Sequence, residues 1–492
     1  MLRLVAALVL SFAAAPAAAQ TTGVLELGDV LAASAARYPE IVEAMARREA
    51  AIGEAFASRG AFDLVFEAEN KSLLSGYYDG VESAVGVSRE IGAFGARAYG
   101  GYRVSRGLFP VYRDAAYTDR SGEAKVGVIF SLLRDREFDD RRLALRNADI
   151  SAVLAEFDLA ITRVSVQKRA ADAYFRWVAA GRQASVYDDL VKMAERRQDA
   201  LRREVESGAR ARIFLTENEQ NLARRRVLAL EAQQRFAIAA NELSLFLRDE
   251  SGDPVTAGID ALPMDRQDPR AQFGFEADVS RATDAIARRP DLARYDGLLK
   301  QARNRLNLAR NNLLPKLDVA FEFSNDFGDV GAGGRTRDGA ESFVGLKLSV
   351  PLQRRKARGD LAVARAELEA FEQDRRLAED SAQAQLRNIV LELDMSRQRA
   401  LLVAHEVAQA KQMEEAERRR FSEGASDFFL VNIREEAAAD ALARLHGADL
   451  DRAYAMSAFL AATVDFKALG LDDGIIDEAG GSGLLAGPDF AE

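Results

Sequence analysis

The distribution of proline is the feature that most limits how this chain can fold. No proline lies between Pro110 and Pro254, or between Pro351 and Pro488. Both stretches are rich in Ala, Leu, Glu, Arg and Gln, which favour helices, whereas a proline inside a helix would break it. The sequence therefore predicts very long helices rather than the several globular domains that 492 residues would otherwise suggest.

Composition removes several classes of function. The absence of cysteine excludes thiol nucleophiles, Cys-ligated zinc, disulfides and an N-terminal lipidated cysteine. The net charge of −10 argues against nucleic acid as a partner. There is no Gly-rich phosphate loop that ends in Gly-Lys-Ser/Thr, and the two histidines, His405 and His446, both fall in helical stretches. We therefore expect no enzyme activity, no metal and no cofactor.

The first residues indicate export. Arg3 supplies a positive charge, Leu4 to Ala15 form an apolar run, and Ala17 to Ala19 offer a cleavage site of small residues before Gln20. This pattern predicts a secretory signal peptide over residues 1–19, because the run is short for a membrane anchor, which is the alternative. No later segment has 18 consecutive apolar residues, so the mature chain could cross a membrane only with strands.

The sequence also repeats itself, and the matches occur in the same order in both halves. The matched segments are Arg37-Tyr38-Pro39-Glu40 with Arg288-Arg289-Pro290-Asp291, Phe66-Glu67 with Phe321-Glu322, Val126-Gly127-Val128 with Val344-Gly345-Leu346, and Glu206-Ser207-Gly208-Ala209 with Ser422-Glu423-Gly424-Ala425. We interpret this as a duplication in which each repeat has the order helix, strands, long helix, glycine turn, helix.

The predicted boundaries follow from this pattern. The first repeat covers residues 20–248, with an opening helix over Leu27 to Arg59, strands over about 62–133, a long helix over 134–207, a tip at Gly208 and a return helix over 209–248. A Pro- and Gly-containing linker covers 249–275. The second repeat covers 276–466, with a helix over Val279 to Asn311, strands over about 316–352, a long helix over 353–421, a tip at Gly424 and a return helix over 427–466. Residues 467–492 form an acidic, Gly-rich tail that we expect to be mobile.

Alternation with a period of two predicts the strands. Val344, Leu346 and Leu348 alternate with small or polar residues, and the segments around Val126, Val319 and Phe66 behave similarly. An apolar face opposite a polar face is typical of membrane β-barrel strands. The alternative is a small sheet packed on a soluble core. The segments from Val85 and from Ala96 also alternate, and the sequence leaves open whether they add strands.

This arrangement resembles the TolC-like outer membrane efflux protein family. The resemblance covers about residues 25 to 466 and rests on the repeated order of elements. The residues that carry it are Leu313-Leu314-Pro315, Ser349-Val350-Pro351-Leu352, and the two tip segments that contain Gly208 and Gly424. It implies a homotrimer with a β-barrel in outer-membrane lipid and a helical coiled-coil barrel in the periplasm of a Gram-negative type envelope. It further implies a passive channel that works with a periplasmic adaptor protein and an inner-membrane transporter driven by protons or by ATP.

The resemblance also assigns site residues. The expected adaptor-docking tips are Gly208, Ala209, Gly424, Ala425 and Ser426. Some relatives carry acidic residues that narrow the tunnel entrance at positions that correspond here to Leu430 and Ile433, and in the first repeat to Phe214 and Glu217. Leu430 and Ile433 are aliphatic and depart from this acidic pattern, and the alternative for Glu217 is an ordinary solvated helix residue.

Trimerisation has separate support. The four strands of the two hairpins cannot close a membrane barrel, and an open edge is costly in lipid, so copies of the chain must pool their strands. Three copies of four strands give twelve, or more if the segments from Val85 and Ala96 are strands. The alternative function is a non-catalytic periplasmic coiled-coil protein with a structural or tethering role, which would explain the helices but not the alternating strands.

Overall fold

The computed structural model describes residues 23–263, 286, 289–335, 337 and 339–471. These residues contain seven α-helices and one antiparallel sheet of six strands. The chain forms two compact units. Among the described residues, the first unit comprises 23–44, 159–263, 286, 289 and 380–471, and the second comprises 45–158, 290–335, 337 and 339–379. The predicted signal peptide, linker residues 264–275 and most of the acidic tail lie outside the described residues.

The opening helix is divided, so the prediction of one continuous helix from Leu27 to Arg59 is wrong. Helix α1 spans Leu27–Arg37, and α2 spans Pro39–Arg59. Tyr38 between them is extended, with φ −69° and ψ 125°. A residue that precedes proline avoids the helical region because the proline ring crowds its backbone. Pro39 can still begin the next helix, where its missing N–H is not needed.

The long helix of the first half is shorter than predicted at its start. It is α3, Asp140–Glu206, and residues 132–139 are irregular rather than helical. The carboxylate of Asp139 accepts a hydrogen bond from the backbone N–H of Arg142 at 2.8 Å, which is the contact of an N-terminal cap. The helix therefore begins after Asp139. The return helix α4 spans Ile213–Ser244, within the predicted range.

In the described part of the second half, one helix and two strands precede the long helix and its return helix, whereas two helices and four strands do so in the first half. Helix α7 spans Pro290–Asn311, α8 spans Arg355–Ser422, and α9 spans Phe428–Thr463. Most of the predicted start of the first of these helices, residues 279–288, lies outside the described residues. No helix in the described part of the chain combines the length and the apolar character needed to cross a membrane.

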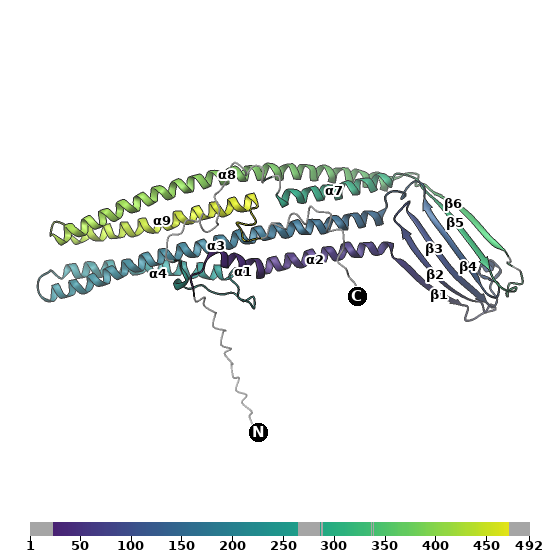
Figure 1. Cartoon of the computed structure of the whole chain (residues 1–492), viewed down its shortest axis with the longest axis horizontal. Helices are drawn as coiled ribbons and strands as arrows, with labels where there is room; N and C mark the ends of the chain where they lie inside the picture. Colours follow the sequence, from purple (N-terminus) through teal and green to yellow (C-terminus); the bar gives the residue numbers. More distant parts are fainter. Residues whose placement is uncertain (1–22, 264–285, 287–288, 336, 338, 472–492) are drawn as a thin grey trace, which may run out of the picture. The chain divides into compact units, whose positions relative to one another are not determined.

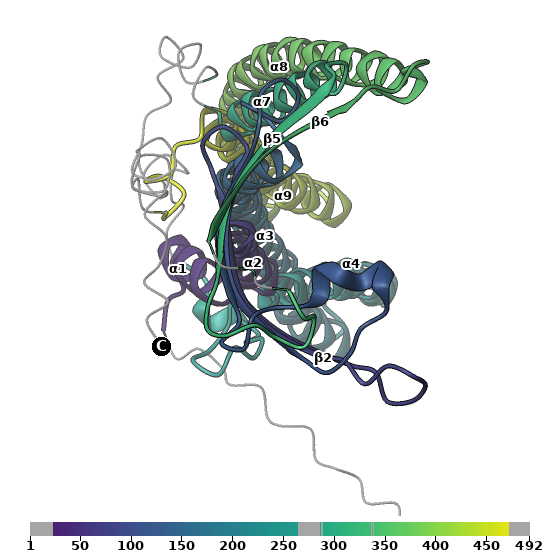
Figure 2. The same cartoon turned by 90° about the vertical axis from the view of Figure 1, so that its right-hand side faces the viewer.

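The six strands follow one another in sequence order across a single sheet (Figure 1). Their bounds are β1 Leu64–Ser72, β2 Val81–Ile91, β3 Ala96–Arg106, β4 Glu123–Ser131, β5 Lys316–Asp326 and β6 Ala340–Ser349. The segments from Val85 and from Ala96, which the sequence left open, lie in β2 and β3. The described chain therefore contributes six strands to the sheet, which is the larger of the two counts that the sequence left open. Figure 2 shows the sheet as a curved layer.

Residues that pair directly across an antiparallel sheet lie on the same face, so the register assigns each side chain to a face. One row runs through Phe66, Val87, Gly100, Val126 and Phe323. The parallel rows on this face are also largely apolar in all six strands. The apolar side chains on it that are more than 40% exposed are Leu64, Phe66, Val85, Val87, Ile91, Tyr102, Val126, Phe321, Phe323, Val344, Leu346 and Leu348.

The opposite face is polar and carries its own hydrogen bonds. The hydroxyl of Tyr99 donates to Glu322 at 2.6 Å, and Arg103 donates to Glu123 at 3.1 Å. The ring of Tyr99 lies over Gly127, where a Cβ atom would come within 2.4 Å of it. Glycine on this face thus leaves room for a large neighbour. Both faces extend through β2 and β3, with Arg89 as a charged residue on the apolar face of β2, opposite Leu64 and Ala98.

The first unit has an aromatic core on α3. Tyr174 and Trp177 are completely buried, with ring centroids 6.0 Å apart. The hydroxyl of Tyr174 donates to the carbonyl of Leu25 at 3.2 Å, which ties the described N-terminal segment to this helix. Their complete burial makes these aromatic side chains part of the packed core of this unit.

Candidate functional site

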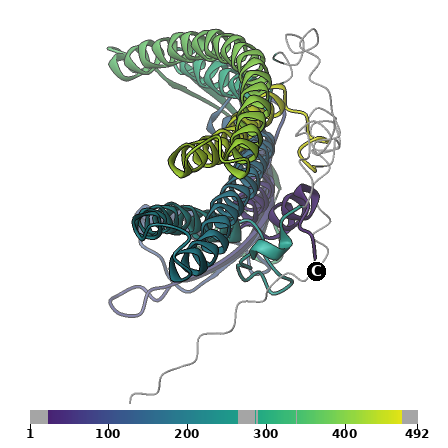
Figure 3. The ribbon, with the colours of Figure 1, turned by 90° about the vertical axis from the view of Figure 1, so that its left-hand side faces the viewer.

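Both predicted tips are reversals between antiparallel helices (Figure 3). Gly208 has φ +78° and Gly424 has φ +77°, a region in which glycine avoids the steric cost of a Cβ atom. The N–H of Ala209 donates to the carbonyl of Glu204 at 2.8 Å, and the N–H of Gly208 donates to the carbonyl of Val205 at 3.0 Å. This pair of bonds is the Schellman motif, which satisfies carbonyls at a helix C-terminus.

The second tip repeats this geometry in detail. The N–H of Ala425 donates to the carbonyl of Arg420 at 2.8 Å, and that of Gly424 donates to Phe421 at 3.0 Å. The next helix, α9, is capped by Asp427, whose carboxylate accepts from the N–H of Leu430 at 2.9 Å. Two halves of the chain therefore end their long helices in the same way, with the glycine at the same position in the motif.

We expect Gly424→Ala to cost about 1 kcal/mol of local stability, because alanine must adopt a left-handed conformation there. No other atom lies within 4 Å of the position that its Cβ would take, so the cost is conformational and not a clash. Gly359, inside α8, is the matched control because it is also open and has no positive φ. Gly359→Ala should be neutral or stabilising. Hydrogen exchange at the end of α8 would measure both effects, and equal exchange in the two variants would contradict the argument.

The tip side chains form an exposed surface. Gly208, Ala209, Gly424 and Ala425 are exposed, whereas Ser426 is half-buried and its hydroxyl donates to Glu417. The two tips also meet. The guanidinium of Arg210 lies 5.3 Å from the ring centre of Phe214 and 5.6 Å from that of Phe421 on the other hairpin. Such cation–π contacts join the two tips into one surface.

The four residues expected at a constriction differ in their surroundings. Phe214 and Glu217 are half-buried on α4, while Leu430 and Ile433 are exposed on α9, by 38% and 42%. The two aliphatic residues therefore give α9 an apolar strip close to its tip rather than an acidic one. The ring of Phe214 contacts the guanidinium of Arg210. Glu217 is the one acidic residue among these four.

A buried ionic cluster lies close to the tips, and the sequence reasoning missed it. Glu435 on α9 is 1% exposed and receives three arginines from three other helices. Its Oε2 accepts from Arg225 on α4 at 3.0 Å, and its Oε1 accepts from Arg197 on α3 and from Arg418 on α8 at 3.2 Å. Because one carboxylate binds α3, α4 and α8, the cluster fastens the two helical hairpins to each other. We call these four residues the Glu435 cluster.

The electrostatics of Glu435 favour its charged form. Burial by itself would raise its pKa, but the hydrogen bond and charge of Arg197 and the charge of Arg225 outweigh burial and hold the pKa below the ordinary glutamate value. Glu435 is thus a carboxylate in the folded protein. One signal in the sequence could have revealed the site: Asn432 and Glu435 are polar residues at helical spacing between Val431 and Ala438, on the buried face of α9.

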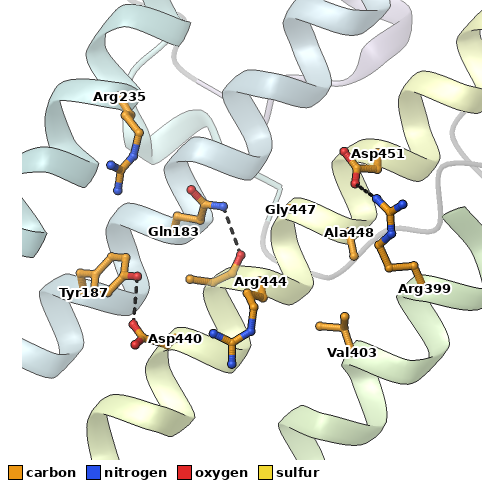
Figure 4. Close-up of a pocket in the computed structure, with 11 residues that line it drawn as sticks. Gln183, Tyr187, Arg235, Arg399, Val403, Asp440, Arg444, Gly447, Ala448 and Asp451 are labelled. Atoms are coloured by element: carbon orange, nitrogen blue, oxygen red, sulfur yellow. Dashed lines mark hydrogen bonds and ion pairs between the residues drawn. The ribbon is translucent and has the colours of Figure 1, made fainter.

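A groove of about 470 Å³ lies further along the same helices (Figure 4). Its lining includes Tyr187 on α3, Asp440 and Arg444 on α9, Arg399 on α8 and Arg235 on α4. The hydroxyl of Tyr187 donates to Asp440 at 3.2 Å. Arg399 pairs with Asp451 at 2.7 Å, and Arg444 with Glu406 at 2.6 Å, so two of its three arginines are already neutralised. Within the described residues, no cluster of His, Cys, Asp and Glu could hold a metal ion.

The chain has the fold of solved outer-membrane channels. The CmeC outer membrane channel of Campylobacter jejuni is similar with a TM-score of 0.63 and 14% identity, over 91% of this chain and 90% of that chain. The MtrE outer membrane channel of Neisseria gonorrhoeae in its open state is similar with a TM-score of 0.65 and 17% identity, over 91% of this chain and 89% of that chain. The outer membrane protein VceC of Vibrio cholerae is similar with a TM-score of 0.63 and 16% identity, over 89% of this chain and 95% of that chain.

The second half of the sequence matches a family model as well. Residues 282–463 match the model described as outer membrane efflux protein, which confirms the resemblance inferred from the sequence. No curated protein matches the chain.

Proposed function

We propose that this chain is the outer-membrane channel of a tripartite export system, a passive duct across the periplasm and the outer membrane. The observation that carries the proposal is the sheet, whose apolar face and polar face both run through all six strands. Lipid on one side and water on the other would satisfy such a surface. The fold and the family match support the same conclusion.

The duct requires several copies of the chain. Six strands are fewer than the eight with which membrane barrels begin, and the sheet has two unpaired edges. An unpaired N–H or C=O group in lipid costs several kcal/mol, on the order of a lost hydrogen bond in hydrocarbon. A homotrimer would bring three sheets together. The polar residues Tyr99, Arg103, Glu123 and Glu322 would then line a water-filled lumen.

Localisation and conductance test the proposal together. The protein should be recovered from the outer-membrane fraction only with detergent, and it should conduct ions through a planar bilayer after reconstitution. A strain that lacks it should retain exported compounds. A protein that is released by osmotic shock and does not conduct would instead be the periplasmic tether.

The tip surface is our proposed docking site for a periplasmic adaptor, which an inner-membrane transporter would join. Support comes from its exposure and from Arg210, which joins the two tips. We expect Ala425→Arg to lower export to the level of the deletion strain, because a long charged side chain would project from an exposed contact surface. Trimer yield should stay unchanged, since Ala425 packs against little else.

The control for this variant is Ala57→Arg, the same substitution at an exposed position of α2 in the other unit. It should export normally. Export rates and crosslinking of the tip to the adaptor would be measured for both variants. Normal export and normal crosslinking by a trimeric Ala425→Arg protein would place adaptor docking elsewhere.

A further inference from the structure

Each of the two outer strands of the sheet has one edge whose backbone groups pair with no other strand of the described chain. β1 pairs with β2 and β6 pairs with β5, and neither has a partner on its other edge within the described chain. All nine residues of β1 are exposed, as are nine of the ten residues of β6. Strand edges of this length attract another strand unless they are covered.

The junction between β4 and β5 supplies a template for closing these edges, because it joins the first half of the chain to the second. In it Val128 is opposite Phe321 and Lys125 is opposite Ser324. β4 leads into the long helix α3, as β6 leads into α8, and both β1 and β5 follow a shorter helix. The sequence matches give the same correspondence, since Val126-Gly127-Val128 resembles Val344-Gly345-Leu346 and Phe66-Glu67 resembles Phe321-Glu322.

We propose that β6 of one copy pairs antiparallel with β1 of a second copy in the register of the β4–β5 junction, with Leu346 opposite Phe66. Three such seams would close a barrel of eighteen strands. The proposal rests on the trimeric channel proposed above, and goes beyond it by fixing which residues of two copies meet.

The transferred register fits both strands. It places Leu348 opposite Leu64 at one end and Ala340 opposite Ser72 at the other, so every residue of β1 gains a partner in β6. Leu346 and Phe66 lie on the apolar face of the sheet, together with Leu348 and Leu64. A slip by one residue would turn every apolar side chain of one strand to the polar face.

Charge supports the same register on the polar face. Glu341 comes opposite Lys71, which in the single chain pairs only weakly, with Glu69 on its own strand in an exposed contact of 2.6 Å. Opposite charges directly across a strand pair are favourable, and like charges are not. A slip of two residues in one direction would place Glu341 opposite Glu69, whereas the proposed register places Phe343 there.

Cysteine pairs can test this seam without background, because the chain has no native cysteine. The test variant is Glu69→Cys with Phe343→Cys, which the proposed register makes direct neighbours. The matched control is Lys125→Cys with Ser324→Cys, the equivalent pair at the β4–β5 junction. Oxidation in isolated membranes should give intermolecular dimers and trimers in the test variant, with nothing larger, and an intramolecular bond in the control.

Two further variants distinguish alternative registers. Each reports a slip of two residues, one in either direction: Glu69→Cys with Gly345→Cys, and Glu69→Cys with Glu341→Cys. Both should crosslink several-fold less than the test pair. Stronger crosslinking of either would overturn the register. No intermolecular product from any pair, in protein that is trimeric and conducting, would overturn the seam while leaving the channel function intact. Failure to trimerise even in the cysteine-free protein would count against the proposed function itself.

Charge reversal gives an independent measurement. Lys71→Glu should lower the amount of heat-resistant trimer, and adding Glu341→Lys should restore it. Trimer loss that the second substitution does not restore would contradict contact between these two positions.

Discussion

Glu435→Gln should loosen the helices near the tips by about 3–5 kcal/mol, the effect of removing one partner from a buried ion cluster. The substitution leaves the charge of Arg225, which is 2% exposed, without its carboxylate. We expect hydrogen exchange around Arg225 and on the facing turn of α9 to become about a hundredfold to several thousandfold faster, because protection reflects the free energy of local opening and each 1.4 kcal/mol is a factor of about ten. Exchange in the sheet should not change.

The control is Glu415→Gln on α8, whose partner Arg419 is exposed by 69%. An exposed ion pair contributes less than about 1 kcal/mol, so exchange should change little. The effect of Glu435→Gln should also depend on pH. Because the folded protein lowers the pKa of Glu435, its stabilisation is complete above the ordinary glutamate pKa of about 4.3 and disappears as the pH falls through the lowered value. A difference between wild type and variant that is independent of pH would contradict this account.

Val85→Lys should reduce the yield of folded trimer strongly, by about 2–4 kcal/mol if the side chain lies near the middle of the bilayer. Val85 is near the centre of β2 and is 45% exposed on the apolar face, where it pairs with Ala68 and Tyr102. A lysine there would place a charge in lipid. Urea unfolding in lipid vesicles and the amount of trimer in the outer membrane would measure the loss.

The neighbouring substitution Ala84→Lys is the matched control, because Ala84 lies on the polar face opposite Glu69. It should fold and insert normally. Equal tolerance of lysine at both positions would mean that β2 and β3 do not form part of the lipid-facing wall, which would remove the basis for eighteen strands.

Long-range patterns in the sequence predicted most of the elements. The glycine turns at Gly208 and Gly424 were predictable because a proline-free helical stretch ended at the same motif in both halves. The break at Tyr38 was predictable in principle, since Pro39 excludes helix from the residue before it. The residue at which α3 begins was harder to predict, because residues 134–139 have a composition typical of helices and the cap by Asp139 depends on local geometry.

The site was harder to predict than the fold. A glutamate inside a helix that is rich in Glu and Arg gives the same local pattern whether it faces water or a neighbouring helix. Glu435 is distinguished by three arginines that are 17, 210 and 238 residues away along the chain. Only the packing of four helices brings these charges together. The tip surface is similar, since Arg210 acquires its role from Phe421 on the other hairpin.

The hairpin of β2 and β3 has a consequence for how such ducts can vary. Its first strand leaves β1 and its second strand returns toward β4, so its insertion leaves the attachments of α2 and α3 on the same side of the sheet. A lineage could therefore change the bore of the duct without rebuilding its helices. In the trimer proposed above, one added hairpin would bring two strands to each of three copies, so the circumference would change in steps of six strands.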